Sequence, residues 1–183
     1  MFNSLLLSLP LLVLSYNFTQ PNVGVPCKGQ KGSSGIRYFY DGETNEIFPF
    51  YYTGCGGDGN RFETRNQAPV RADDMPCPGY PNSNGSCNIL YFNGQPLKNC
   101  SKNYYCVMSW TGMGGYCCDA GARDRSLANK KAPICLSNKQ KPVSYRDDDR
   151  ELTLIGRNCT HEFCPSGSRC YQGEFYGYCC LEK

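Results

Sequence analysis

Residues 37–62 read RYFYDGETNEIFPFYYTGCGGDGNRF, and this stretch decides the fold of the first third of the chain. Two runs, residues 36–40 and 48–52, are rich in aromatic side chains, which favour β-strands. Residues 41–45 between them contain Asp, Gly and Asn, which are typical of turns. The stretch therefore predicts a β-hairpin. No part of the chain shows the sustained apolar spacing of an amphipathic helix.

Outward from the hairpin, the 14 cysteines of the chain fall into three groups, each with an even number. Each group can be paired within itself, although six cysteines allow fifteen pairings and the connectivity stays open. The grouping predicts modules at residues 20–75, 77–118 and 135–180, with a polar linker at residues 119–134. The groups are Cys27 and Cys55; Cys77, Cys87, Cys100, Cys106, Cys117 and Cys118; and Cys135, Cys159, Cys164, Cys170, Cys179 and Cys180.

The second and third groups form an internal repeat. Each contains two cysteines separated by five residues and ends in two adjacent cysteines that follow a Tyr, as in Tyr116-Cys117-Cys118 and Tyr178-Cys179-Cys180. Adjacent cysteines rarely pair with each other, because a disulfide holds its two Cα atoms about 4.4–6.8 Å apart with specific torsions. We therefore expect each adjacent pair to tie two different segments to one strand.

The N-terminus and the composition indicate export. Residues 1–15 form a Leu-rich segment too short to span a bilayer, and we expect a signal peptide that is cleaved after Ser15. Residues 16–183 hold 14 cysteines but only 25 Leu, Ile, Val and Phe residues, so disulfides would have to support a thin core in an oxidising compartment. Four triplets with the N-glycosylation pattern agree with a secreted, extracellular protein. They begin at Asn17, Asn84, Asn99 and Asn158.

Residues 24–65 resemble the Kunitz family of serine-protease inhibitors. Residues 25–29 (VPCKG) look like the reactive-site segment of that family, and residues 37–40 and 50–57 look like its two strands and the turn that follows them. The spacing of the signature residues follows the family pattern without a gap. These residues are Arg37, Tyr38, Tyr40, Phe50, Tyr52, Gly54, Asn60 and Phe62.

The resemblance implies an α+β module built on a twisted β-hairpin, which inhibits proteases by mimicking a substrate. The rigid loop of such inhibitors enters the protease cleft in extended form, with its ordering cost already met by the fold. Lys28 would fill the primary pocket of a trypsin-like protease, Gly29 would suit the crowded scissile position, and a Cys27–Cys55 disulfide would tie down the loop. Asn60 would hydrogen-bond to backbone inside the module.

Two of the three disulfides usual in the family have no cysteines here. Ile47 and Ala68 stand at the position of one missing pair, where they could pack together, and Phe18 and Ala72 stand near the position of the other. Losing a bridge typically costs a small domain about 2–5 kcal/mol. The resemblance therefore leaves open whether the module is stable enough to inhibit.

Two further departures concern the backbone. Pro69 falls inside the C-terminal helix of the family, where a proline removes a hydrogen bond and clashes with the preceding turn. Residues 28–37 carry about four more residues than the family pattern, including the Gly and Ser of residues 32–35, which add freedom to the loop. A non-inhibitory use of the same scaffold is therefore the alternative hypothesis.

Residues 77–118 and 135–180 resemble the lustrin-type cysteine-rich domains that accompany Kunitz domains in secreted nematode proteins. Six cysteines ending in an adjacent pair carry this resemblance, which implies extracellular architecture rather than an activity. The predicted fold is a small, disulfide-rich, multi-module one, in which two small β or irregular cysteine-rich modules follow the Kunitz-like α+β module.

Other classes of function find little support. A Cys–His catalytic pair needs a free thiolate, whereas every cysteine has a candidate partner and His161 is the one histidine of the chain. The cysteine spacing lacks the paired C-x2-C of structural zinc sites, and a net charge of +3 predicts no nucleic-acid groove. We therefore expect no enzyme activity, metal, cofactor, nucleic-acid partner or membrane span. The candidate partners are a trypsin-like serine protease or, for the alternative, proteins of an extracellular matrix or cuticle.

Overall fold

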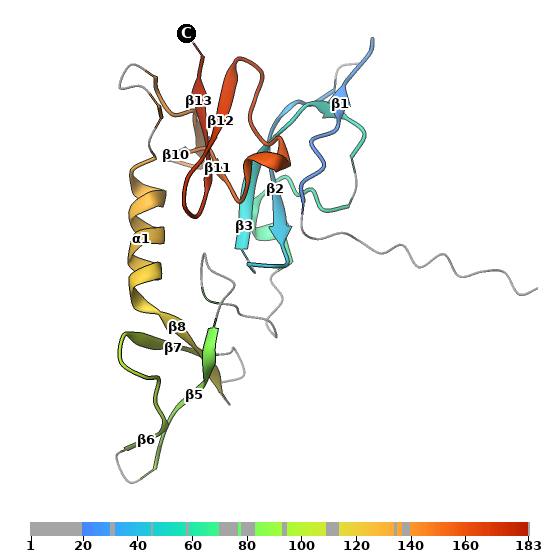
Figure 1. The fold of residues 1–183 in the computed structure, drawn as a ribbon. Coiled ribbons are helices and arrows are strands. Elements are labelled where there is room, and N and C mark those ends of the chain that lie inside the picture. Colours follow the sequence, from blue (N-terminus) through green and yellow to red (C-terminus); the bar gives the residue numbers. More distant parts are fainter. Residues whose placement is uncertain are drawn as a thin grey trace, which may run out of the picture.

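The computed structural model describes residues 20–29, 32–44, 46–57, 59–69, 77, 83–92, 95–108, 114–133, 135–136 and 140–182. The predicted signal peptide at residues 1–15, together with Asn17, Phe18 and Ala72, lies outside the described residues. The described part is mainly β-structure with one α-helix, held by seven disulfides (Figure 1).

The predicted hairpin is present as strands β2 (Gly35–Asp41) and β3 (Glu46–Tyr52), which pair antiparallel. Four consecutive β2 residues, from Tyr38 to Asp41, are buried. Successive side chains of a strand point to opposite faces, so this burial means that both faces of the hairpin are covered. On one side an isolated bridge joins Tyr38 to Phe62, with backbone hydrogen bonds of 2.8 Å in both directions.

Short elements flank the hairpin. Strand β1 (Val25–Pro26) pairs antiparallel with β4 (Gly54–Cys55), and a single 3-10 turn, η1, covers Arg65–Gln67. Within residues 59–69 this turn is the one helical element, and these residues do not form the α-helix expected of the α+β module. The cause is Pro69, which disfavours helical dihedrals at the preceding Ala68 and leaves it extended, with φ −71° and ψ 132°.

The second module forms a four-stranded sheet with the order β6-β5-β8-β7. Its strands are β5 (Ser83–Phe92), β6 (Gln95–Lys98), β7 (Tyr104–Met108) and β8 (Gly115–Asp119). The register of β7 against β8 places Cys106 opposite Cys117. The adjacent cysteines therefore lie on a central strand of this sheet, where they can reach partners on different segments.

Residues 119–134, expected to be a polar linker, contain helix α1 (Ala120–Lys131), although the sequence shows no sustained helical periodicity there. Asp119 caps the helix by accepting a hydrogen bond from the amide of Ala122 at 2.8 Å, and two lysines in the last turn face the negative end of the helix dipole. The apolar periodicity is weak because the buried residues of the helix are Ala122 and Ser126, which leave no apolar stripe in the sequence.

The third module contains a hairpin and a three-stranded sheet. Strands β9 (Ser144–Asp147) and β10 (Arg150–Thr153) form the hairpin. Strands β11 (Ile155–Gly156), β12 (Ser168–Gln172) and β13 (Gly177–Leu181) form the sheet, in the order β11-β13-β12, and a 3-10 turn, η2, covers Cys159–His161.

All 14 cysteines are paired, and each disulfide joins two cysteines of the same group. In both repeats the first cysteine pairs with the sixth, the second with the fourth and the third with the fifth. Each adjacent pair thus ties two different segments to one strand, as the repeat predicted. The bridges are Cys27–Cys55; Cys77–Cys118, Cys87–Cys106 and Cys100–Cys117; and Cys135–Cys180, Cys159–Cys170 and Cys164–Cys179.

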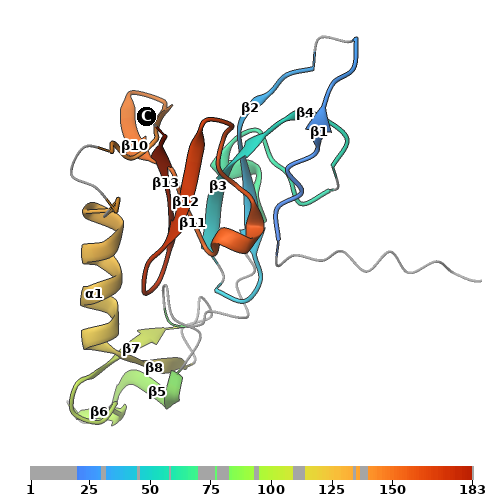
Figure 2. The same cartoon turned by 45° about the horizontal axis from the view of Figure 1, so that its top comes forward.

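One hydrophobic core spans the first and third modules, although no disulfide joins them. In Figure 2 the sheet that contains β12 and β13 lies beside the β2–β3 hairpin, and α1 runs along one side between the second and third modules. Phe39 and Phe50 of the hairpin and Phe163 and Tyr176 of the third module are each 0% exposed in this core. The module boundaries predicted from the cysteines therefore do not coincide with separate hydrophobic cores.

Candidate functional site: the segment around Lys28

Residues 25–29 form an exposed segment, here named the bait segment. Lys28 and Gly29 are exposed, and the Val25 side chain is 60% exposed. Cys27, half-buried, is joined to Cys55 by the disulfide that the family resemblance implied. In Figure 2, β1 and the start of β2 lie at the end of the molecule away from the second module. The lysine is therefore presented to solvent directly beside a covalent tether.

The base of the bait segment is a two-stranded ladder. Val25 lies opposite Cys55 and Pro26 lies opposite Gly54. Just before the ladder, the carbonyl oxygen of Val23 accepts two hydrogen bonds from Thr53, one from its amide at 2.9 Å and one from its hydroxyl at 2.8 Å. The segment is thus attached to the end of β3 by backbone pairing as well as by the disulfide.

Tyr52 organises the turn that follows β4. Its hydroxyl donates to the carbonyl oxygen of Gly56 at 2.6 Å, and the guanidinium of Arg61 lies 4.1 Å from its ring centroid. Arg61 also donates to the same carbonyl oxygen. A cation over an aromatic face is stabilising. Sequence reasoning assigned Tyr52 to the signature but gave no role to Arg61, because the two residues meet only once the turn is closed.

The four-residue insertion folds back towards the disulfide. Arg37 donates to the carbonyl oxygen of Ser33 at 3.1 Å and to its hydroxyl at 3.0 Å. A Cβ atom added at Gly32 would meet the Sγ atom of Cys27 and would lie 2.9 Å from the carbonyl oxygen of Gly54. The inserted stretch therefore packs against the base of the bait segment, and only a glycine fits at position 32.

The backbone turns away from an extended path immediately after Lys28. Gly29 has φ +72°, in the left-handed region that glycine adopts at little cost. A substrate in a protease cleft is extended on both sides of the scissile bond, as the resemblance implies for this loop. The residues before Lys28 include strand β1 and are extended, as a substrate would be. After Lys28 the backbone changes direction at Gly29.

The remaining signature residues lie inside the hairpin. Asn60, which is 0% exposed, hydrogen-bonds to the backbone of Tyr40, and Phe62 pairs with Tyr38. Phe50 is fully buried. The structure therefore separates the predicted residues into an exposed set at the bait segment and a buried set that supports it.

A contact from the third module, which sequence reasoning missed, reaches the signature residue Tyr38. Its hydroxyl donates to Asp147 at 2.8 Å. Burial, and then the hydrogen bond to the Asp147 carboxylate, raise the pKa of Tyr38 far above its ordinary value. The phenol is therefore a hydrogen-bond donor at all physiological pH values.

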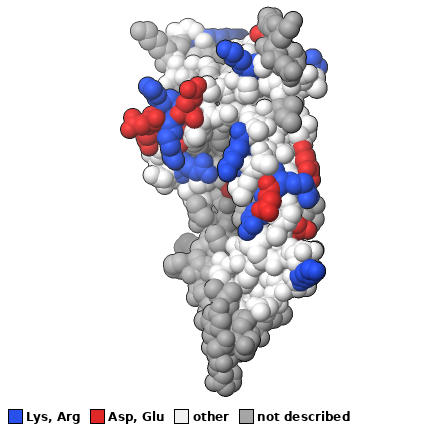
Figure 3. Space-filling model, turned by 90° about the vertical axis from the view of Figure 1, so that its left-hand side faces the viewer, with Lys and Arg blue, Asp and Glu red and all other residues white. Residues whose placement is uncertain are grey.

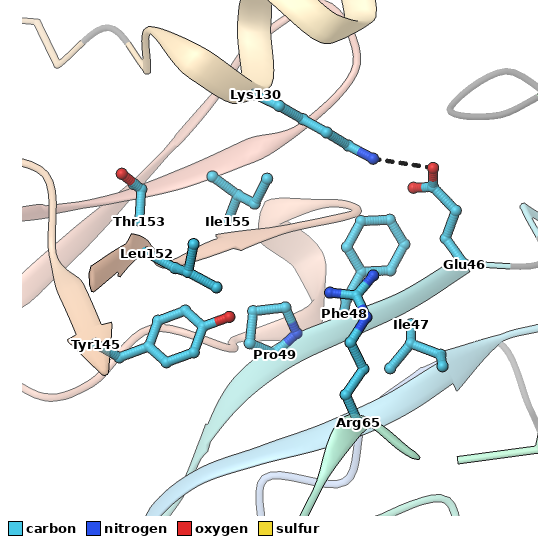
Figure 4. A pocket seen from close by; sticks show the side chains of 10 residues that line it. All are labelled: Glu46, Ile47, Phe48, Pro49, Arg65, Lys130, Tyr145, Leu152, Thr153 and Ile155. Atoms are coloured by element: carbon cyan, nitrogen blue, oxygen red, sulfur yellow. Dashed lines mark hydrogen bonds and ion pairs between the residues drawn. The ribbon is translucent and has the colours of Figure 1, made fainter. Parts of the chain in front are cut away.

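A pocket of about 230 Å³ lies where β3, the C-terminal end of α1 and the third module meet (Figure 4). The ion pair between Lys130 and Glu46, 2.9 Å apart, lines one end. Ile47, at the position of a missing family cysteine, also lines the pocket and is half-buried, while Ala68 is 6% exposed. The site of this missing bridge therefore borders the contact between the first and third modules.

Sulfur atoms approach one another in the second module. Those of Cys87, Cys100 and Cys117 lie within 4.8 Å, a spacing compatible with a metal ion. All three belong to disulfides, and a metal ligand must be a thiolate. The cluster in its oxidised state therefore does not offer the chemistry of a metal site.

Two of the four predicted glycosylation positions have described side chains. Asn99 and Asn158 are both exposed, and the side-chain oxygen of Asn158 accepts from the amide of Thr160 at 3.0 Å. Asn17 and the side chain of Asn84 lie outside the described residues. Both described positions lie on the surface, as glycosylation requires.

The hairpin, the single bridge and the exposed lysine define a Kunitz-type module followed by two disulfide-rich repeats. A family profile of the Kunitz/Bovine pancreatic trypsin inhibitor domain matches residues 18–68. A BPTI/Kunitz inhibitor domain-containing protein of Caenorhabditis elegans is 34% identical over 160 residues, covering 86% of this chain and 84% of the relative. The chain therefore belongs to the family of BPTI/Kunitz inhibitor domain-containing proteins.

Two further relatives differ in how much of the chain they match. The major allergen Ani s 1 of Anisakis simplex is 28% identical over 165 residues, 86% of this chain and 82% of its own length. PI-stichotoxin-Hcr2g of Radianthus crispa is 49% identical over 45 residues, 25% of this chain and 73% of its own length. No solved structure matches the chain. Members of the Kunitz family are protease inhibitors rather than enzymes, which supports a non-enzymatic function at the level of the family.

Proposed function

We propose that this protein is a secreted Kunitz-type inhibitor that binds trypsin-like serine proteases through Lys28. The single observation that carries the proposal is the exposed lysine directly after Cys27, whose disulfide to Cys55 fixes it to strand β4. The family membership and the seven disulfides support an extracellular inhibitor-like protein.

The inhibitory step would be reversible and non-covalent. The Lys28 ammonium would enter a primary pocket whose floor carries a carboxylate, as in trypsin. The β1–β4 ladder and the disulfide hold the residues before Lys28 in place, so the ordering cost of binding has largely been met by the fold. A bound protease would have to accommodate the left-handed backbone of Gly29 or shift it to an extended conformation.

One face of the molecule shows how its charges are distributed. On the face shown in Figure 3, the described acidic and basic side chains lie close together, with no broad area of one sign among them. No helix among the described residues has the length and apolar character needed to cross a bilayer.

The test is a titration of trypsin with purified, disulfide-intact protein. We expect stoichiometric inhibition by the wild type and a loss of affinity of about 100-fold or more for Lys28→Ala, because a buried anchor residue dominates such an interface. Lys102→Ala, which removes an exposed lysine in the second module, is the matched control and should inhibit like the wild type. Equal inhibition by both variants would exclude Lys28 as the contact residue.

The second candidate is an extracellular binding protein of a matrix or cuticle, in which the Kunitz scaffold no longer inhibits. The backbone turn at Gly29 favours this alternative, because it departs from an extended bait. It predicts slow cleavage of the Lys28–Gly29 bond by trypsin without stoichiometric inhibition. The likeness of the two repeats to lustrin-type domains, which implies an extracellular setting, stays a prediction.

A further inference from the structure

The hairpin of the first module packs face to face with the third module. The rings of Phe48 and Tyr176 have centroids 6.1 Å apart, and those of Phe39 and His161 are 5.9 Å apart. Phe39 and Tyr176 are 0% exposed, and Phe48 is 3% exposed. The apolar face of the hairpin is therefore removed from water by residues more than 100 positions later in the chain.

Phe163 is a buried member of the shared core and is joined to the hairpin through its backbone. Its carbonyl oxygen accepts a hydrogen bond from the amide of Tyr51 at 2.9 Å, and its side chain is 0% exposed. A Cβ atom added at Gly156 would lie 2.6 Å from the Phe163 ring, so the neighbouring strand is seated directly against it. The adjacent Cys164 is bridged to Cys179, which fixes the backbone of Phe163 to β13.

Three polar contacts surround this apolar centre. Besides the hydrogen bond of Tyr38 to Asp147, Glu46 pairs with Lys130 at 2.9 Å. At the far end of β2, the Asp41 carboxylate, 1% exposed, lies 3.8 Å from the guanidinium of Arg157. Buried polar groups need such partners, so the hairpin ends are matched to the third module and to α1 in charge as well as in shape.

The contact continues to the bait segment in short steps along the backbone. Tyr51 hydrogen-bonds to Phe163, Thr53 bonds to Val23, and Val25 pairs with Cys55. Along the chain these links lie two residues apart, at residues 51, 53 and 55. A displacement of Phe163 would therefore reach the base of the bait segment through hydrogen-bonded strands.

We propose that the third module is a non-covalent buttress that replaces the two disulfides missing from the Kunitz-like module. Residues 140–182 cover the hairpin face and, through Phe163, fix the end of β3 from which the bait segment is held. The first module therefore depends on the third for its fold. The proposal does not rest on inhibition, since it concerns the hairpin whether or not Lys28 binds a protease.

The test uses the full-length protein with its disulfides intact and compares Phe163→Ala with Leu181→Ala. Leu181 belongs to the same module but is 48% exposed, so its truncation controls for a general loss of apolar surface. Amide hydrogen exchange is measured separately for β2–β3 and for β12–β13, together with thermal unfolding. We expect exchange in β2–β3 to accelerate about 100-fold or more and Tm to fall by about 10 °C in Phe163→Ala alone.

Accelerated exchange in β2–β3 supports the buttress, whether or not β12–β13 changes as well. Unchanged exchange in β2–β3 overturns it. If Phe163→Ala is not recovered with the wild-type disulfide pattern, Phe163→Leu takes its place and the same reading applies, with a smaller acceleration expected. Titration of the same variants against trypsin separates the proposed inhibition from the proposed support of the hairpin. A wild type that does not inhibit contradicts the proposed function, while the exchange result alone tests the role of the third module.

Discussion

The side chain of Asn60 brackets the backbone of Tyr40. Its Oδ1 accepts from the Tyr40 amide at 3.0 Å, and its Nδ2 donates to the Tyr40 carbonyl oxygen at 2.9 Å. Both residues are at most 1% exposed. A loop residue therefore provides the hydrogen bonds for two backbone groups of a buried strand that water does not reach.

Replacing Asn60 by Ala should destabilise the protein by about 2–5 kcal/mol, because two buried backbone groups lose their partner and each costs about 1–3 kcal/mol. Equilibrium unfolding in denaturant, followed by circular dichroism, measures the effect. Asn66→Ala, at an exposed position in η1, is the control and should change the free energy of unfolding little. A similar loss in both variants would contradict the bracketing role.

The sequence allowed the hairpin to be predicted because its evidence is local. Aromatic runs on both sides of a polar turn are sufficient, and β2 and β3 follow the predicted segments closely. Helix α1 was missed because Ala122 and Ser126, its buried residues, carry no apolar signal. The helix-favouring signal that was present is Asp119 as a cap before a run of Ala, Arg and Leu.

The contact between the modules could not be predicted from the sequence in the same way. Phe39 and Phe163 are apolar residues in two segments that each lie within a group with an even number of cysteines, and no local pattern pairs them. Likewise, one of fifteen pairings occurs in each repeat, and spacing alone did not select it. The exposed position of Lys28 was predicted from the family resemblance rather than from the physics of its neighbours.

Gly24 should resist substitution more strongly than Gly29, although both have φ +72°. An added Cβ at Gly24 would lie 2.6 Å from Cε2 of Tyr52 and nearer still to the Cys55 carbonyl oxygen, whereas at Gly29 no atom of the described residues lies within 4 Å. Gly29→Ala should cost about 1 kcal/mol from backbone strain, and Gly24→Ala about 2–4 kcal/mol because it adds a clash. Thermal unfolding of the two variants provides the comparison, and equal losses would contradict the crowding argument.

The contact between the first and third modules should weaken on acidification because of His161. Burial, and to a lesser degree the charge of Arg157, lower the pKa of His161 below 6.5, while Asp41 and Glu43 act in the opposite direction. Its Nδ1 is buried without a hydrogen-bond partner among the described residues, so a proton added there finds no acceptor. The unfolded chain therefore takes up a proton more readily than the folded chain.

Stability from this group is complete above pH 6.5 and is lost as the pH falls below that value. Burial raises the pKa of Asp41 above 3.8, so its protonation stabilises the fold on acidification, in the opposite direction to His161 and in both proteins alike. Lowering the pH from about 7.5 to about 5.5 should therefore reduce Tm more for the wild type than for His161→Gln. A decline of the same size in both proteins would assign it to other groups.

If Lys28 is the primary specificity residue, the Lys28→Phe variant should change the target protease rather than abolish binding. The trypsin pocket carries a carboxylate and that of chymotrypsin is an apolar slot, so the variant should lose at least about 100-fold in affinity for trypsin and gain affinity for chymotrypsin. Lys28 is exposed, which means that Tm should remain within a few degrees of the wild type. Inhibition constants for both proteases, measured on the same preparations, decide the matter. An unchanged preference would place the protease contact elsewhere, and cleavage after residue 28 by chymotrypsin without inhibition would favour the non-inhibitory scaffold.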